Sequence, residues 1–135
     1  MKTNKKFLNT LYSIENIHKE NNAEKITVRI AIDPLHEVFT GHFPGNPVLP
    51  GACTIQIIKE LVESVTGRDL MLAGAGNIKY LSFINPEKNK ILDIDLLLKE
   101  MDAGMFFCNA SVHFEGTIFC SFRGTLSPFP EAFSD

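Results

Sequence analysis

Residues 41–51 read GHFPGNPVLPG, and residues 52–65 follow directly as ACTIQIIKELVESV. Three prolines and three glycines stiffen the first segment, so we expect a loop that holds its side chains in fixed places. Pro50 opens and Gly67 closes a helix over residues 51–65, in keeping with the residue preferences at helix ends. No other stretch predicts a long helix as clearly, so the fold is expected to centre on this one.

The predicted helix has one broad apolar side. On a helical wheel this side is formed by Ile55, Ile57, Ile58, Leu61, Val62 and Val65. The polar residues gather opposite and are Gln56, Lys59, Glu60 and Glu63. The apolar side is therefore expected to pack against a sheet.

Period-two alternation of apolar and polar residues predicts strands elsewhere in the chain. The clearest runs cover residues 26–32, 92–98, 106–114 and 118–122. Glu115-Gly116 leaves room only for a tight turn between the last two runs, which predicts an antiparallel hairpin. Residues 102–104 are expected to form the turn before it.

Two further strand predictions rest on weaker patterns. Residues 8–17 form one candidate, joined through Asn21-Asn22 to the strand that follows. Residues 70–83 form the other, although Gly74 and Gly76 weaken the pattern. The chain is thus expected to combine five or six strands with one long helix.

Composition favours one compact domain over residues 1–135, with an irregular tail at 127–135. The chain has 135 residues, of which 44% are hydrophobic and 21% charged. A formal net charge of -3 provides no broad basic field for nucleic acid or an anionic membrane. No apolar run has the length of a signal peptide or a membrane span, so we expect a cytoplasmic protein.

The three cysteines, Cys53, Cys108 and Cys120, suggest neither a disulfide framework nor a zinc site. Their number is odd and none are spaced as CxxC. We therefore expect no metal site and a reducing environment.

The loop at residues 41–51 brings together two groups that acid–base chemistry on a thioester requires. His42 is expected beside the N-terminal end of the helix, where the first N–H groups have no partner within the helix. An imidazole can take the proton next to a thioester carbonyl, and free N–H groups can stabilise the enolate-like oxygen.

GHFPGNPVLPG resembles the GHFPGxPxxPG signature of FabZ- and FabA-type 3-hydroxyacyl-acyl-carrier-protein dehydratases. The resemblance implies their α+β hot-dog fold, an antiparallel sheet wrapped around one long central helix, over nearly the whole chain. Residues 77–90, which include Phe83 and Pro86, resemble the family's strand and turn after the helix more loosely.

Carried over by position, the resemblance implies a role for several residues. His42 corresponds to the catalytic histidine, and Gly51 to the residue whose N–H polarises the thioester carbonyl. Phe43, Pro50 and Phe83 are expected to contact the substrate, which is an acyl-carrier-protein or CoA thioester. No cofactor is implied. The family builds its site across two subunits, which implies a homodimer or an assembly of dimers.

Gln56 departs from the family pattern, because family members have a carboxylate at this position of the helix. An amide cannot exchange a proton, so Gln56 is expected to orient the hydroxyl group or a water molecule. Glu60 and Glu63 follow on the same side of the helix, and either is a candidate substitute for the carboxylate.

Three functions therefore remain open from the sequence. The first is a dehydratase that forms trans-2-enoyl thioesters in fatty acid or related lipid or polyene synthesis. The second is a non-catalytic acyl-binding or carrier-docking subunit, paired with an active chain that supplies the carboxylate. The third is a hot-dog thioesterase, which would need a carboxylate to activate water.

The stiff loop also predicts backbone strain near His42 and Phe43, including a non-proline cis peptide bond. Such a bond costs about 3 kcal/mol and persists only where the surrounding structure enforces it.

Overall fold

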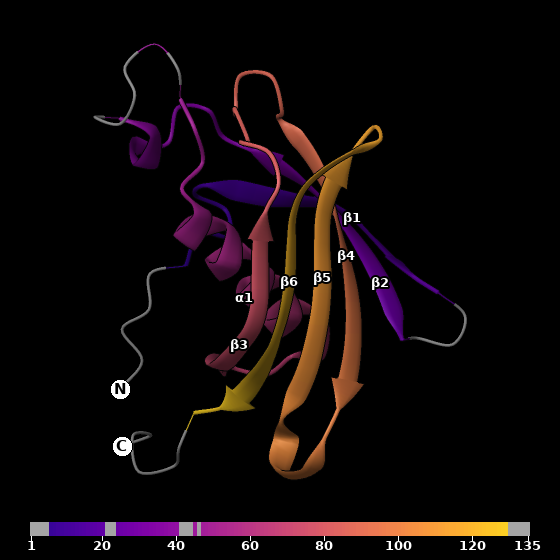
Figure 1. Ribbon diagram of the computed structural model, residues 1–135. Coiled ribbons are helices and arrows are strands. Elements are labelled where there is room, and N and C mark those ends of the chain that lie inside the picture. The colour runs from indigo at the N-terminus through magenta and orange to yellow at the C-terminus, as the bar shows by residue number, and fades with distance from the viewer. Residues whose placement is uncertain (1–5, 21–23, 41–44, 46, 130–135) are drawn as a thin grey trace.

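The computed structural model describes residues 6–20, 24–40, 45 and 47–129 (Figure 1). Within these ranges the chain forms six strands, one α-helix and two short 3-10 helices. In chain order they are β1 (Tyr12–Lys19), β2 (Lys25–Ile32), η1 (Glu37–Phe39), α1 (Gly51–Thr66), β3 (Leu70–Tyr80), β4 (Ile91–Glu100), η2 (Asp102–Gly104), β5 (Phe106–Phe114) and β6 (Thr117–Pro128).

The strands form one antiparallel sheet in the order β1-β2-β4-β5-β6-β3. Figure 1 shows α1 against one face of this curved sheet, beside β3. Apolar residues of β2, β4, β5 and β6 on that face are buried together with the apolar side of α1. The predicted hot-dog arrangement is thus confirmed.

Helix α1 begins where the sequence predicts and ends one residue later, at Thr66. Gly67 follows with φ 72°, a left-handed conformation that glycine adopts without strain, and its N–H donates to the Glu63 carbonyl oxygen at 2.8 Å. Ile57, Ile58 and Leu61 are at most 1% exposed. Among the described helices, none has the length and hydrophobicity to span a lipid bilayer.

The hairpin between β5 and β6 is confirmed. Glu115 and Gly116 have φ values of 47° and 84°, and two consecutive positive φ values are typical of a type I′ turn. The connection from β4 to β5 is also compact, since η2 occupies Asp102–Gly104.

The first strand prediction was wrong at its start, because β1 begins at Tyr12 rather than at residue 8. The preceding residues form a turn in which the Phe7 carbonyl oxygen accepts from the N–H groups of Thr10, Leu11 and Tyr12. Asn9 has a φ of 68° in this turn. The turn that was expected at Asn21-Asn22 lies outside the described residues.

The third strand was predicted three residues too long, since β3 ends at Tyr80. Its pairing with β6 shifts register between Leu72 and Gly74 and again between Ala75 and Asn77. Glycine is common at such bulges, which explains why the glycines weaken the alternating pattern without ending the strand.

The tail begins later than predicted. Strand β6 continues to Pro128, because Ser127 and Pro128 pair with Met71 and Leu70 of β3. Residues 130–135 lie outside the described part of the chain.

Candidate active site

A mainly apolar pocket of about 350 Å³ lies at the N-terminal end of α1. Its walls come from the segment before α1, the first turn of α1, the end of β3, the segment after it, and β6. Three residues that the sequence analysis singled out, Pro50, Gly51 and Phe83, line this pocket together. Their contact with a substrate stays a prediction.

Tyr80, which the sequence analysis missed, lies directly over Gly51. A Cβ atom at Gly51 would come within 2.7 to 2.9 Å of the Tyr80 ring and hydroxyl, so only glycine fits beneath the ring as it stands. Tyr80 is 56% exposed at the mouth of the pocket. The available signal was an aromatic residue near the C-terminal end of the predicted strand over residues 70–83.

Cys120 also lines the pocket. Burial raises the pKa of its thiol, which keeps the thiol protonated at neutral pH. Since the thiolate is the nucleophilic form, Cys120 is poorly suited to take up an acyl group.

His42 and Phe43 lie outside the described residues, and so does the backbone strain expected there. The catalytic role of His42, the substrate contact of Phe43 and the strained backbone therefore stay predictions. The C-terminal part of the same loop is fixed, because Leu49 N–H donates to the Ile84 carbonyl oxygen at 2.9 Å. This hydrogen bond joins the approach to α1 to the segment after β3, and both line the pocket.

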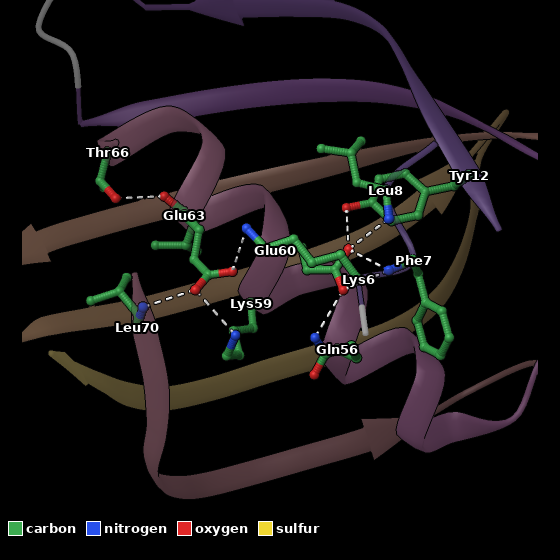
Figure 2. A network of polar contacts seen from close by, with 11 residues as sticks. Lys6, Phe7, Leu8, Tyr12, Gln56, Lys59, Glu60, Glu63, Thr66 and Leu70 are labelled. Carbon is green, nitrogen blue, oxygen red and sulfur yellow. Dashed lines mark hydrogen bonds and ion pairs between the residues drawn. The ribbon is translucent and has the colours of Figure 1, made fainter. Parts of the chain in front are cut away.

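Gln56 lies on α1 but not in the wall of this pocket. Its side-chain nitrogen, Nε2, donates to Glu60 Oε2 at 2.8 Å, and the residue is half-buried. In Figure 2 the Gln56 amide oxygen points away from Glu60.

Glu60 is buried and fully engaged with donors from this chain. Its side chain is 1% exposed, although it belongs to the polar side of the predicted helix. Phe7 N–H donates to both carboxylate oxygens at 2.9 and 3.1 Å, Leu8 N–H to Oε1 at 2.9 Å, and Tyr12 O–H to Oε1 at 3.0 Å (Figure 2). Burial, together with the negative charge of Glu60, raises the pKa of Tyr12, so Tyr12 stays a donor.

Glu63 is also buried, at 7% exposure. Its Oε2 accepts from Leu70 N–H at 2.8 Å and pairs with the Lys59 ammonium at 3.2 Å. Glu63 thus fixes the start of β3 to α1. Neither helix glutamate is among the described residues that line the pocket, and the same is true of Gln56. Both carboxylates are engaged by donors of their own chain, and a role for either as a substitute for the family's carboxylate stays a prediction.

Replacing Glu60 by leucine is expected to lower the free energy of unfolding by about 3 kcal/mol, since several buried donors would lose their charged acceptor. Tyr12→Phe removes one of these hydrogen bonds and should cost about 1 kcal/mol. Urea unfolding of both variants followed by circular dichroism measures the difference. Equal stability of Glu60→Leu and wild type would show that the carboxylate is not needed to hold the N-terminal turn.

Comparisons with known proteins agree with the fold and the loop motif. Residues 18–121, well over half of the chain, match the ApeI-like family, described as ApeI dehydratase. The match includes the loop, all of α1 and most of the sheet.

Curated relatives carry the name 3-hydroxyacyl-[acyl-carrier-protein] dehydratase FabZ. The Enterococcus faecalis protein is 29% identical over an alignment of 89 residues, and the alignment covers 61% of this chain and 63% of that protein. The Levilactobacillus brevis protein is 26% identical over an alignment of 106 residues, and the alignment covers 73% of this chain and 72% of that protein. The chain therefore spans less than two thirds of the length of the Enterococcus relative.

Solved structures share the fold at low sequence identity. An uncharacterised protein from Erwinia carotovora subsp. atroseptica aligns with a TM-score of 0.65 at 22% identity, covering 89% of this chain and 98% of that one. The dehydratase heterocomplex ApeI:P from Xenorhabdus doucetiae aligns with a TM-score of 0.63 at 18% identity, covering 82% and 94%. Together with the family match over residues 18–121, the comparisons show that this chain belongs to the ApeI-like dehydratase family.

Proposed function

We propose that this chain is a dehydratase that removes water from a 3-hydroxyacyl thioester carried by an acyl carrier protein, giving the trans-2-enoyl thioester. The observation that carries the proposal is the apolar pocket at the start of α1, where Gly51 lies directly after a dehydratase-type loop. The family match supports the reaction class, and the names of the FabZ relatives support the acyl carrier.

The proposed reaction needs one base and one oxyanion donor. His42 takes the proton from C2 while the thioester oxygen accepts a hydrogen bond from Gly51 N–H at the positive end of α1. The C2 electron pair then forms the double bond to C3 as the C3–O bond breaks. The imidazolium of His42 returns its proton to the departing hydroxyl, which leaves as water.

This route assigns Gln56 an orienting role instead of a proton transfer. It needs no carboxylic acid, because one imidazole serves first as base and then as acid. The acyl chain would lie along Pro50 and Phe83 in a pocket with mainly apolar walls. Phe43 is proposed as a further substrate contact.

We also propose that two chains associate through β3. This strand is at the edge of the sheet, and its residues 72–77 are exposed. Unpaired backbone groups on such an edge favour pairing with another strand. Tyr80 ends this strand, and Leu81 and Phe83 come shortly after it. The three side chains are 56%, 57% and 82% exposed, which adds apolar surface for a partner. In such a dimer Gln56 of one chain would serve the pocket of the other.

A partner subunit is the second candidate function, and Gln56 is the observation that favours it. The Xenorhabdus protein with this fold belongs to a dehydratase heterocomplex. A related chain with a carboxylate at this helix position would then complete the site. A thioesterase is less well supported, because Glu60 is enclosed by donors from its own chain and has no open oxygen to activate water.

The purified chain, incubated with a 3-hydroxyacyl carrier protein, tests these candidates. The proposal expects a carrier-bound product lighter by one water. Release of free carrier thiol would indicate a thioesterase, and an unchanged substrate would indicate the partner subunit. Sedimentation at micromolar concentration tests the dimer, and a species of monomer mass alone would contradict it.

Gly51→Ala is expected to lower turnover roughly 10- to 100-fold, because the new methyl group would displace the Tyr80 ring from the pocket mouth. The melting temperature should change little, since Tyr80 is half exposed and can move. If the displaced ring causes the loss, Gly51→Ala adds no further loss in a Tyr80→Ala background. An additive loss in the double variant would instead attribute the effect to Gly51 itself.

A further inference from the structure

The hydrogen bond between Gln56 and Glu60 determines which end of the Gln56 amide faces outward. Glu60 accepts four hydrogen bonds from Phe7, Leu8 and Tyr12, so it acts as a carboxylate acceptor. A carboxylate only accepts, hence the atom of Gln56 at 2.8 Å from it must be the nitrogen. The amide oxygen is then the atom that points away from Glu60, as Figure 2 shows, and this direction is called outward below.

The acceptor that sets this orientation is itself rigid. Phe7 and Leu8 belong to the hydrogen-bonded turn before β1, and the Tyr12 side chain is 2% exposed. Donors from these three residues therefore hold Glu60 on the side of α1 that lies opposite its apolar side. A side chain held by several hydrogen bonds can fix the orientation of the group that it contacts, as supporting residues do around reactive centres.

We propose that Glu60 is a positioning residue that holds the Gln56 amide with its oxygen outward, where that oxygen accepts a hydrogen bond from the 3-hydroxyl of the substrate. This inference rests on the proposed dehydratase function and specifies the substrate class. A site that presents an acceptor favours acyl thioesters with a hydroxyl at C3 over analogues without a donor there, such as the 3-oxo or unsubstituted thioester.

The orientation also explains how an amide serves at this position. The hydroxyl donates its hydrogen to Gln56 Oε1, which leaves the lone pairs of the hydroxyl oxygen free to accept the proton of the proposed acid. The hydroxyl oxygen takes up that proton as the C3–O bond breaks, and Gln56 itself exchanges no proton.

Glu60→Gln tests the proposal with almost no change in shape. The oxygen of the new amide would still accept from Phe7, Leu8 and Tyr12, but its nitrogen would face Gln56. Gln56 must then turn over to present its oxygen to that nitrogen, which leaves its own nitrogen outward. We expect kcat/KM for the 3-hydroxyacyl thioester to fall roughly 10- to 100-fold in a folded protein.

Exchanging the two residues should restore the orientation. In Gln56→Glu combined with Glu60→Gln, one oxygen of the new carboxylate accepts from the nitrogen of the new amide, and the other faces outward as an acceptor. Activity should return at least to the wild-type level. An exchanged protein that is as impaired as Glu60→Gln would overturn the proposal.

Glu63→Gln is the matched control. It is the same substitution on the same helix, it retains an oxygen for Leu70 N–H, and it loses the charge that pairs with Lys59. No hydrogen bond joins Glu63 to Gln56 among the described contacts. Its kcat/KM should equal that of wild type, and a loss as large as that of Glu60→Gln would overturn the proposal.

Nuclear magnetic resonance tests the positioning independently of turnover. In the wild type the Gln56 side-chain amide should show one proton protected from solvent exchange, and Glu60→Gln should remove that protection. Two rapidly exchanging amide protons in the wild type would overturn the inference even if dehydration is observed. A protected amide in a protein that does not dehydrate would reject the proposed function and leave the positioning intact.

Discussion

His42→Ala is expected to lower the rate of enoyl formation roughly 100- to 10,000-fold, the usual contribution of a general base. The imidazole is the group that the proposal assigns to remove the C2 proton. Mass spectrometry of the carrier-bound product in samples quenched at successive times measures the rate.

His18→Ala provides the control for this change. His18 lies on β1 with its side chain 66% exposed, and a loss of its imidazole should leave the rate unchanged. An H42A protein as active as H18A would show that the loop motif does not carry the chemistry.

Gln56→Glu is expected to raise the rate of dehydration roughly 100- to 10,000-fold, because a carboxylic acid can donate a proton directly to the departing hydroxyl. The gain should depend on His42, which still removes the C2 proton. Steady-state rates of Q56E, and of Q56E combined with H42A, measure both effects. An unchanged rate in a folded Q56E protein would contradict the assignment of position 56 to the site.

The Gln56→Glu variant should also have a characteristic pH profile. The new carboxyl group would replace an amide that lies 2.8 Å from Glu60, so the negative charge of Glu60 should raise the pKa of the new group. A raised pKa keeps the acid protonated below that pKa, and the rate gain is lost as the pH rises through it. Replacing Glu60 by glutamine removes the like charge, so the loss should then occur at lower pH.

Local patterns predicted the elements that depend on local chemistry. The helix start at Gly51 and the turn at Glu115-Gly116 follow from the conformational preferences of proline and glycine. The four clearest alternating runs all form strands, because each has one face on the core. The arrangement of these elements in space was predicted from the resemblance of residues 41–51 to a dehydratase signature.

Contacts over long sequence distances were not predictable in the same way. A helical wheel places Glu60 on the polar side of α1, but it cannot show that the turn before β1 covers that side and supplies its donors. For the same reason the first strand was predicted to start too early. The packing of Tyr80 over Gly51 likewise joins residues that the sequence separates.

The most direct test of the central claim is to incubate the purified chain with a trans-2-enoyl carrier protein in water enriched in oxygen-18. Dehydration is reversible, so the account predicts a 3-hydroxyacyl thioester that carries the label on its C3 hydroxyl and remains attached to the carrier. Label in a free carboxylate together with free carrier thiol would indicate thioester hydrolysis, and an unlabelled enoyl thioester would indicate no catalysis. Either of these two results would contradict the proposed function.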